Sequence, residues 1–188
     1  MPLTELPLPF HPAVRYQCWE LPAAQDVGSA DLPDPIDGAK DQLICEAFGA
    51  YHAVEAFPSR KPKPVQGVHI SFSHSRELIV LAYGSCNVGI DLQYYTDKLV
   101  RVSSKFISEH ERSLLSTEEQ QFNRQVHYMW CAKEAVFKLY GTEVPFKDIV
   151  SDTLDLRESG EIGVTVKGLH RHTVNYCFFN DFCFCIAT

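Results

Sequence analysis

Hydrophobic positions change from a helical period to a strand period along the first half of the chain. Over residues 38–57 apolar side chains recur every three or four positions, which predicts an amphipathic helix capped by Asp37. Three apolar or alternating runs follow at 68–73, 78–83 and 88–93, and turn residues separate them. Such runs predict three strands of a β-meander.

Helical and strand patterns alternate again in the second half. The predicted elements are short helices over 97–106 and 108–116, a long helix from Ser116 or Thr117 to about Tyr140, a strand over 162–166 and a hairpin over 173–187. Asn180 and Asp181 suit the type I′ turn of that hairpin. A short strand is also predicted over 16–19. This order favours an α+β fold with antiparallel sheets.

Composition agrees with a globular protein. The chain has 188 residues, of which 45% are hydrophobic and 22% charged. Its longest apolar run, 78–83, is far shorter than the roughly 20 residues of a membrane helix. The first residues do not resemble a signal peptide. We therefore expect no membrane association.

The net charge and the cysteine content indicate which partners and which cellular compartment to expect. The net charge of −7 argues against general nucleic-acid binding, because few cations are available to displace counterions from phosphate. The seven cysteines are odd in number and irregularly spaced, which predicts reduced thiols in a cytoplasmic protein. Cys183 and Cys185 alternate with phenylalanines, so we expect core-facing thiols there rather than a zinc site.

The long predicted helix carries a candidate polar site. On a helical wheel Glu134 and Lys138 lie almost opposite the apolar stripe, one turn apart, with Trp130 one turn before them. An exposed glutamate–lysine pair without a function would have the same spacing. A tryptophan on the polar face weakens that interpretation.

Three further motifs carry side chains that suit phosphate chemistry. Asp91 lies on a predicted strand, where it could bind a divalent metal or simply face water. Glu111 completes a Ser-x-x-Glu capping box and could also be a general base. Ser73, His74 and Ser75 lie at a strand end, where hydroxyls and an imidazole could hold phosphate.

The motifs occur in a fixed order over about residues 60–141. They read Ser-His-Ser, then Gly-Ile-Asp-Leu, then Phe-Ile-Ser-Glu-His-Glu, then Trp-Cys-Ala-Lys-Glu-Ala-Val-Phe-Lys. Either Gly-Ile-Asp or Trp-x-x-Lys-Glu-Ala-x-x-Lys alone would be modest evidence, but together they are specific. The series resembles the 4′-phosphopantetheinyl transferases of the Sfp type.

The resemblance implies an activity and its partners. Such an enzyme transfers the 4′-phosphopantetheine arm of coenzyme A to a serine of an apo acyl or peptidyl carrier protein and releases adenosine 3′,5′-bisphosphate. It uses Mg²⁺, for which Mn²⁺ could substitute. The basic residues Lys98, Arg101, Lys105, Arg112 and Arg124 predict a docking surface for an acidic carrier.

The resemblance also implies residue roles. The metal would be held by Asp91 and Glu134, Glu111 would take the serine proton, and Lys138 would lie near the scissile phosphate. Coenzyme A would contact Ser73, His74, Ser75 and Lys133, and either Lys61 or Lys63. Gln93 stands where the family often has another acid, so its amide oxygen is a weaker candidate ligand.

The implied fold has two similar lobes related by a pseudo-twofold axis, each a small antiparallel sheet with a packed helix. Residues 1–87 would form the lobe on the coenzyme A side, and residues 88–188 the lobe with the metal and the catalytic helix. The active site would lie between the lobes of a monomer. Gln93 and the short first half favour an alternative, a catalytically impaired coenzyme A or carrier-protein binder of the same fold.

Overall fold

A computed structural model of the chain describes residues 12–21, 35–56, 61–141 and 144–188. The first half contains β1 (Val14–Glu20), α1 (Pro35–Phe48), β2 (His69–Ser75) and β3 (Leu78–Gly84). The second half contains β4 (Gly89–Tyr94), α2 (Asp97–Val102), η1 (Ser103–Lys105), α3 (Glu109–Ser113), α4 (Glu119–Tyr140), η2 (Phe146–Asp148), β5 (Ile149–Ser151), β6 (Ser159–Val166), β7 (His170–Phe178) and β8 (Phe182–Ala187). The predicted strands, long helix and terminal hairpin are all present, with shifted ends. The predicted type I′ turn at Asn180 and Asp181 is wrong, because neither residue has the positive φ that this turn requires.

The described strands form two antiparallel sheets, which confirms the predicted α+β class. One sheet has the order β1-β3-β2 and the other the order β4-β8-β7-β6-β5. The predicted three-strand meander is wrong, because β4 leaves the β2–β3 hairpin and pairs with β8. Every residue of β8 is buried, so this distant segment offers β4 a partner with two apolar faces.

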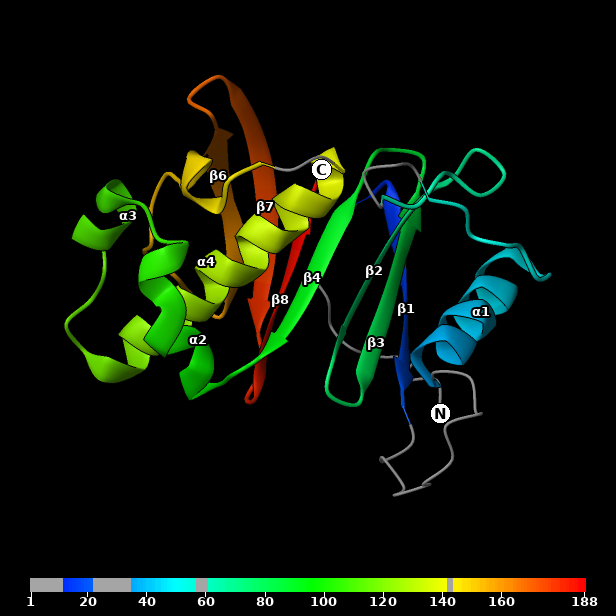
Figure 1. Ribbon diagram of the computed structural model, residues 1–188, viewed down its shortest axis with the longest axis horizontal. Helices are drawn as coiled ribbons and strands as arrows, with labels where there is room; N and C mark the ends of the chain where they lie inside the picture. The colour runs from blue at the N-terminus through cyan, green and yellow to red at the C-terminus, as the bar shows by residue number, and fades with distance from the viewer. Residues whose placement is uncertain (1–11, 22–34, 57–60, 142–143) are drawn as a thin grey trace.

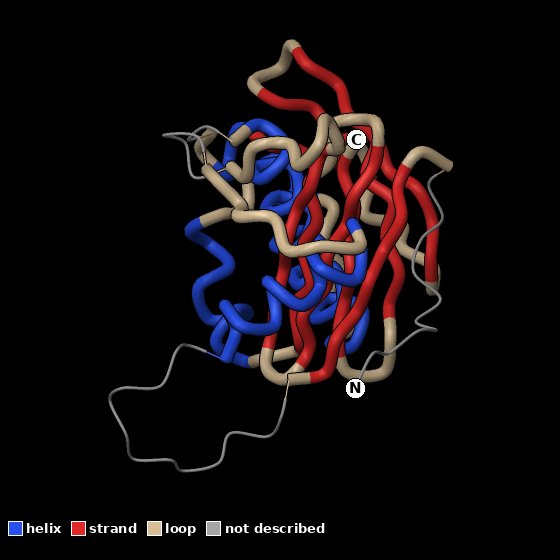
Figure 2. The backbone as a smooth tube through the Cα atoms, turned by 90° about the vertical axis from the view of Figure 1, so that its right-hand side faces the viewer, coloured by secondary structure: helices blue, strands red, loops and turns tan. Residues whose placement is uncertain are grey.

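Hydrophobic side chains join the elements in layers. The helix α1 packs on one face of the three-stranded sheet, around Leu43 and Ile79. The opposite face packs against β4 and β8 through residues such as Val80 and Phe184, and α4 covers the other face of the five-stranded sheet. Figure 1 shows α1 beside the three-stranded sheet and α4 lying across the five-stranded sheet, and Figure 2 shows the strands running side by side along one direction.

The ends of two helices differ from the prediction for local reasons. The first helix stops at Phe48 because Gly49 adopts a left-handed conformation with φ of 74°. Asp37 lies in its first turn rather than at the cap, and residue 57 lies outside the described residues. The long helix is capped by Glu118, whose carboxylate accepts hydrogen bonds from the next turn, and not by Ser116 or Thr117.

Among the described residues, none of the helices combines the length and the apolar character that a membrane span requires.

Candidate active site

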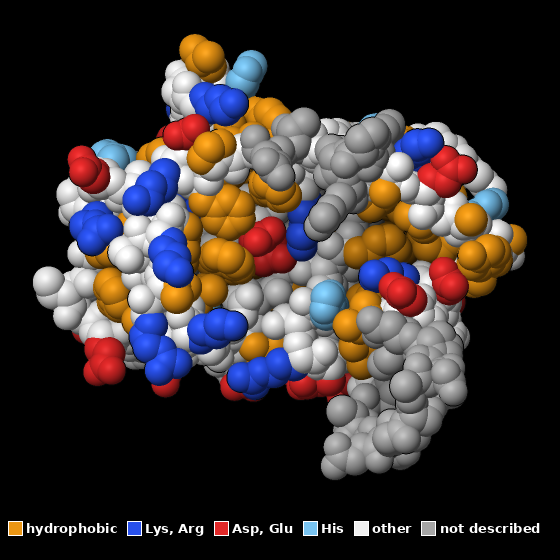
Figure 3. Space-filling view, viewed as in Figure 1, with side chains coloured by type: hydrophobic (Ala, Val, Ile, Leu, Met, Phe, Trp, Pro, Cys, Tyr) orange, Lys and Arg blue, Asp and Glu red, His pale blue; other side chains and the backbone are white. Residues whose placement is uncertain are grey.

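A cleft of about 760 Å³ opens between α4 and the first half of the chain. Its second-half lining comes from β4 and α4, and its first-half lining comes from α1, β2 and the segment after α1. Figure 3 shows acidic, basic and hydrophobic side chains meeting in this hollow. The sequence-predicted residues that line it are Lys61, Ser73, His74, Asp91, Gln93, Trp130, Glu134 and Lys138.

Asp91 is held on the floor of the cleft by two donors. Its Oδ1 accepts a hydrogen bond from Ser73 Oγ at 2.9 Å and an ion-pair contact from Lys138 Nζ at 2.7 Å. Lys138 also donates to the carbonyl of Ile90 at 2.9 Å. The Asp91 side chain is only 9% exposed, so its orientation is fixed by these partners.

Serine hydroxyls of β2 bind the backbone of β4, although the two strands belong to different sheets. The Oγ atoms of Ser71, Ser73 and Ser75 accept from the backbone nitrogens of Ile90 at 3.1 Å, Leu92 at 2.9 Å and Tyr94 at 3.4 Å. Side chains on one face of a strand repeat every second residue, as these contacts do. The predicted phosphate contacts Ser73 and Ser75 therefore serve the junction of the sheets.

Glu134 faces the same part of the cleft as Asp91. Burial, and after it the charge of Asp91, raise the pKa of the Glu134 carboxyl to about 7, against a smaller opposite effect of Lys138. Two carboxylates and one ammonium leave an excess of negative charge in a partly desolvated site. Carboxylate oxygens are the ligands that Mg²⁺ prefers, so the donor set fits a divalent cation.

Gly89 allows β4 to approach α4 closely enough to bring these groups together. A side chain there would overlap the carbonyl oxygen of Ala135 and lie 2.5 Å from the backbone nitrogen of Leu139. Both are main-chain atoms of α4, which cannot move away individually. The room that a glycine leaves beside Asp91 is therefore occupied by a helix backbone.

The candidate lysines of the first half lie in different surroundings. Lys61 lines the cleft and donates to Leu139 O at 2.5 Å and to Asn87 Oδ1, and burial lowers its pKa. Lys63 lies outside the cleft lining and pairs with Glu55 at 2.7 Å on the surface. Lys40, on α1, lines the cleft and pairs with Asp37 at 2.9 Å. Residues 58–60, which directly precede Lys61, lie outside the described residues.

His74 and Gln93 line the cleft as the sequence suggested. His74 is exposed, and Gln93 is half-buried. The amide nitrogen of Gln93 donates to Tyr94 O at 2.8 Å, which fixes the orientation of the amide group.

Glu111 and Lys133 are close to each other but do not line the cleft. Glu111 is 0% exposed and completes the predicted capping box with Ser108. Lys133, 1% exposed, pairs with the Glu111 carboxylate at 2.7 Å. Burial lowers the pKa of Lys133, and Glu111 opposes that shift. This placement does not support a coenzyme contact for Lys133 or a solvated position for Glu111.

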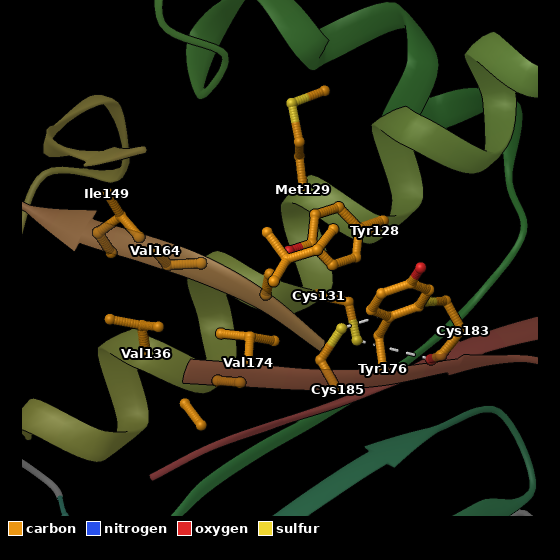
Figure 4. Close-up of a cluster of buried hydrophobic side chains, with 14 of the residues drawn as sticks. Tyr128, Met129, Cys131, Val136, Ile149, Val164, Val174, Tyr176, Cys183 and Cys185 are labelled. Atoms are coloured by element: carbon orange, nitrogen blue, oxygen red, sulfur yellow. Dashed lines mark hydrogen bonds between the residues drawn. The ribbon is translucent and has the colours of Figure 1, made fainter. Parts of the chain in front are cut away.

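Three buried thiols lie behind the strand that carries Asp91. Cys131 donates to Asp91 O at 3.0 Å, and the sulfurs of Cys183 and Cys185 are 4.0 Å apart. Figure 4 shows the thiols of Cys131 and Cys185 meeting among hydrophobic side chains. Burial raises the pKa of Cys131 and of Cys185 well above the usual value, so these two are neutral thiols. The prediction that Cys183 and Cys185 face the core is confirmed.

The second half of the chain, which carries Asp91 and Glu134, matches a known protein family. The family model of the 4′-phosphopantetheinyl transferase superfamily matches residues 87–187, more than half of the chain. The chain belongs to this superfamily. The match covers β4 and α4, which carry Asp91 and Glu134, so the expected family is confirmed, and the two antiparallel sheets with packed helices agree with its two-lobed fold.

Three curated relatives show the same kinship at modest identity. The chain is 26% identical over 103 residues to the 4′-phosphopantetheinyl transferase ffp of Bacillus subtilis, covering 54% of this chain and 46% of that protein. It is 23% identical over 103 residues to the transferase Sfp of Bacillus subtilis strain 168, with the same two coverages. It is 28% identical over 100 residues to psf-1 of Bacillus pumilus, covering 53% and 42%. The chain matches less than half the length of these relatives.

Some residues that shape the site were not anticipated from the sequence. Asn87 binds both Lys61 and, through its amide nitrogen at 3.0 Å, the carbonyl of Leu139. It thereby ties the first half to the end of α4. The alternation of Ser71, Ser73 and Ser75 on a largely buried strand was a usable signal, because buried hydroxyls require partners. Nothing in the sequence indicates which partners they have.

Proposed function

We propose that this chain transfers the 4′-phosphopantetheine group of coenzyme A to a serine of an apo acyl or peptidyl carrier protein. The observation that carries the proposal is the convergence of Asp91 and Glu134 in one cleft, within the part of the chain that matches the superfamily. Phosphoryl transfer depends mainly on alignment and charge neutralisation, and this cleft offers both.

Asp91 and Glu134 would hold Mg²⁺ or Mn²⁺, and the amide oxygen of Gln93 would be an additional, uncharged ligand. When bound, the metal supplies positive charge to the pyrophosphate of coenzyme A. Lys138, already at 2.7 Å from Asp91, keeps that carboxylate oriented and adds a second cation beside the phosphates.

The coenzyme would occupy the cleft between the two halves. Lys61 and His74 line it from the first half, so residues 1–87 would form the coenzyme A side and residues 88–188 the metal and catalytic side. Lys63 is less well placed, because its ammonium pairs with Glu55 at the surface.

The proposed reaction is a single displacement at phosphorus. The serine oxygen forms a bond to the phosphorus that carries pantetheine, and the bond from that phosphorus to adenosine 3′,5′-bisphosphate breaks. The serine proton is released. The cleft residues bind and align the two substrates for this displacement.

Intact mass spectrometry tests the proposal directly. Purified protein, coenzyme A, Mg²⁺ and a panel of apo carriers should yield at least one carrier that gains the phosphopantetheine mass. Chelation of the metal should stop the gain, and Mn²⁺ should restore it. If every fatty-acid, polyketide and peptide-synthetase carrier keeps its apo mass while coenzyme A or a carrier still binds, the alternative of a non-catalytic binder replaces this function.

The carrier is proposed to dock on α2 and α3. The exposed basic residues of this segment are Lys98 and Arg101 on α2, Lys105 on η1 and Arg112 on α3, and Leu114 directly after α3 is exposed too. Figure 3 shows lysine and arginine side chains gathered over this part of the surface. Arg124, predicted to belong to the same surface, instead pairs with Glu158 at 2.9 Å and covers the ring of Phe178. A local positive surface on an acidic protein suits an acidic partner.

Charge reversal of Arg101 and Lys105 should weaken carrier binding selectively. The double variant Arg101→Glu/Lys105→Glu is expected to raise the KM for the carrier by about tenfold, because long-range attraction is lost. The KM for coenzyme A should stay unchanged. Arg15→Glu, an exposed change on β1, provides the control. An equal rise in both KM values would assign these residues to the coenzyme or to the fold.

A further inference from the structure

The ion pair between Glu111 and Lys133 joins four elements away from the cleft. Lys133, on α4, donates from Nζ to Glu111 Oε2 on α3 at 2.7 Å. It also donates to the carbonyls of Phe146, in η2, at 2.9 Å and of Ile149, in β5. An ammonium has three N–H donors, so these contacts use all of them.

Both carboxylate oxygens of Glu111 accept hydrogen bonds. Its Oε2 accepts from both the backbone nitrogen and the hydroxyl of Ser108, each at 2.9 Å, besides Lys133. Its Oε1 accepts from the backbone nitrogen of Ser151 at 3.2 Å. A general base must reach the proton that it accepts, directly or through one water. A carboxylate with no exposed surface and four donors has no such access to a carrier serine.

The position of Lys133 on α4 links this ion pair to the metal site. Consecutive side chains of an α-helix diverge by about 100°, so the direction of Lys133 determines the direction of Glu134. Lys133 points towards α3 and β5, and Glu134 then points towards β4 and Asp91. On the β4 side, Lys138 fixes the same helix through Ile90 O. The helix is therefore held on two sides.

We infer that Glu111 and Lys133 are positioning residues, which fix the rotation of α4 so that Glu134 faces Asp91, and that Glu111 is not the proton acceptor. The inference rests on the proposed function for its catalytic consequence. Its structural consequence, a correctly aimed pair of metal ligands, can be measured without any transfer reaction.

The test is a cycle of Glu111→Gln, Lys133→Met and the double variant. Glu111→Gln leaves a buried ammonium without its counter-ion, and Lys133→Met leaves a buried carboxylate, so each should distort the packing of α4. Mn²⁺ affinity, measured by electron paramagnetic resonance without coenzyme A or carrier, should fall about 10–100-fold in Glu111→Gln, as when an outer partner of a metal ligand is lost. The double variant has no unpaired charge and should recover to within about tenfold of the original affinity and turnover.

The other outcomes each overturn the inference. Normal Mn²⁺ affinity with a turnover about 10²–10⁴-fold lower in both Glu111→Gln and the double variant would identify Glu111 as the base. If Glu111→Gln has normal Mn²⁺ affinity and normal turnover, the Glu111–Lys133 pair contributes to stability only and does not position Glu134. If the double variant binds Mn²⁺ as weakly as Glu111→Gln does, the pairing of the two opposite charges does not fix the rotation of α4.

Two controls separate these outcomes from general damage. Arg171→Gln breaks an ion pair with Asp152 at 2.5 Å in which the arginine is exposed, and it should change neither quantity. Circular dichroism reports whether each variant folds, and where a single variant does not, the double variant alone decides between base and positioning. If the unaltered protein binds Mn²⁺ but modifies no carrier, the proposed function fails while the metal-affinity cycle still tests the positioning of Glu134.

Discussion

Glu134→Gln is expected to remove nearly all metal-dependent transfer while leaving the protein folded. The substitution keeps the size of the side chain and its helix propensity but takes one of two carboxylates from the proposed metal site. Loss of an outer partner of a metal ligand typically costs about 10–100-fold, so loss of a ligand itself should lower turnover by about 100-fold or more. The residual activity should need a higher Mg²⁺ concentration, measured by titration against carrier modification.

The stability of the same variant provides an independent check. Because burial and Asp91 raise the pKa of Glu134 from 4.5 to about 7, the folded state binds this proton more tightly than the unfolded chain does. In metal-free buffer the original protein should therefore lose stability as the pH rises from about 4.5 to about 7. Glutamine carries no such proton, so at pH 8 Glu134→Gln should resist urea at least as well as the original protein.

A matched substitution on the same helix controls for general effects. Glu119→Gln changes an exposed carboxylate in the first turn of α4, far along the helix from the cleft. It should leave turnover and Mg²⁺ dependence unchanged and cost at most a few tenths of a kcal/mol, through the helix dipole. Normal metal dependence in Glu134→Gln would remove the central ligand from the proposed site.

Gly89→Ala is expected to destabilise the protein and to separate the candidate metal ligands. The new methyl group would overlap the carbonyl oxygen of Ala135 and lie 2.5 Å from the nitrogen of Leu139. Overpacking against a rigid backbone should lower the free energy of unfolding by about 3 kcal/mol or more, at the upper end of such substitutions. Urea denaturation measures that change. The folded fraction should also bind Mn²⁺ more weakly, because β4 carries Asp91 and must move away from α4.

Gly38→Ala makes the same chemical change where there is room. Nothing lies within 4 Å of a side chain built at Gly38, which is exposed on the helix α1. Alanine should stabilise that helix by about 0.5–1 kcal/mol. Equal stability of Gly89→Ala and the original protein would show that β4 and α4 are not held at this distance.

The candidate site was predicted in part from local patterns. Asp91, Glu134 and Lys138 were identified from a strand motif and a helix motif, and all three line one cleft. Trp130 lines it too, as its place on the polar helix face suggested. Periodicity supports such predictions because it reports which way a side chain points from its own element. It cannot report what lies opposite that side chain.

Glu111 and Lys133 show the limit of local patterns. The Ser-x-x-Glu box correctly predicted the cap that Glu111 forms, but the helical wheel did not reveal that Lys133 points into the interior towards it. Charged residues are seldom fully buried unless they are paired, and the two members of this pair are 22 positions apart. Because local sequence patterns contain no information on contacts between distant residues, they predict that both charged side chains are exposed to solvent.

Local periodicity and short motifs were sufficient to predict the α+β class, the superfamily and the two candidate metal ligands, because each of these features can be recognised within one short segment. The pairing of β4 with β8, the hydrogen bonds from β4 to the serines of β2, and the buried ion pair between α3 and α4 became visible only in the folded chain. Each of these results joins segments far apart along the chain. A buried polar group can no longer hydrogen-bond to water, so it must find a partner in another part of the protein. Which partner is within reach depends on the folded arrangement of distant segments.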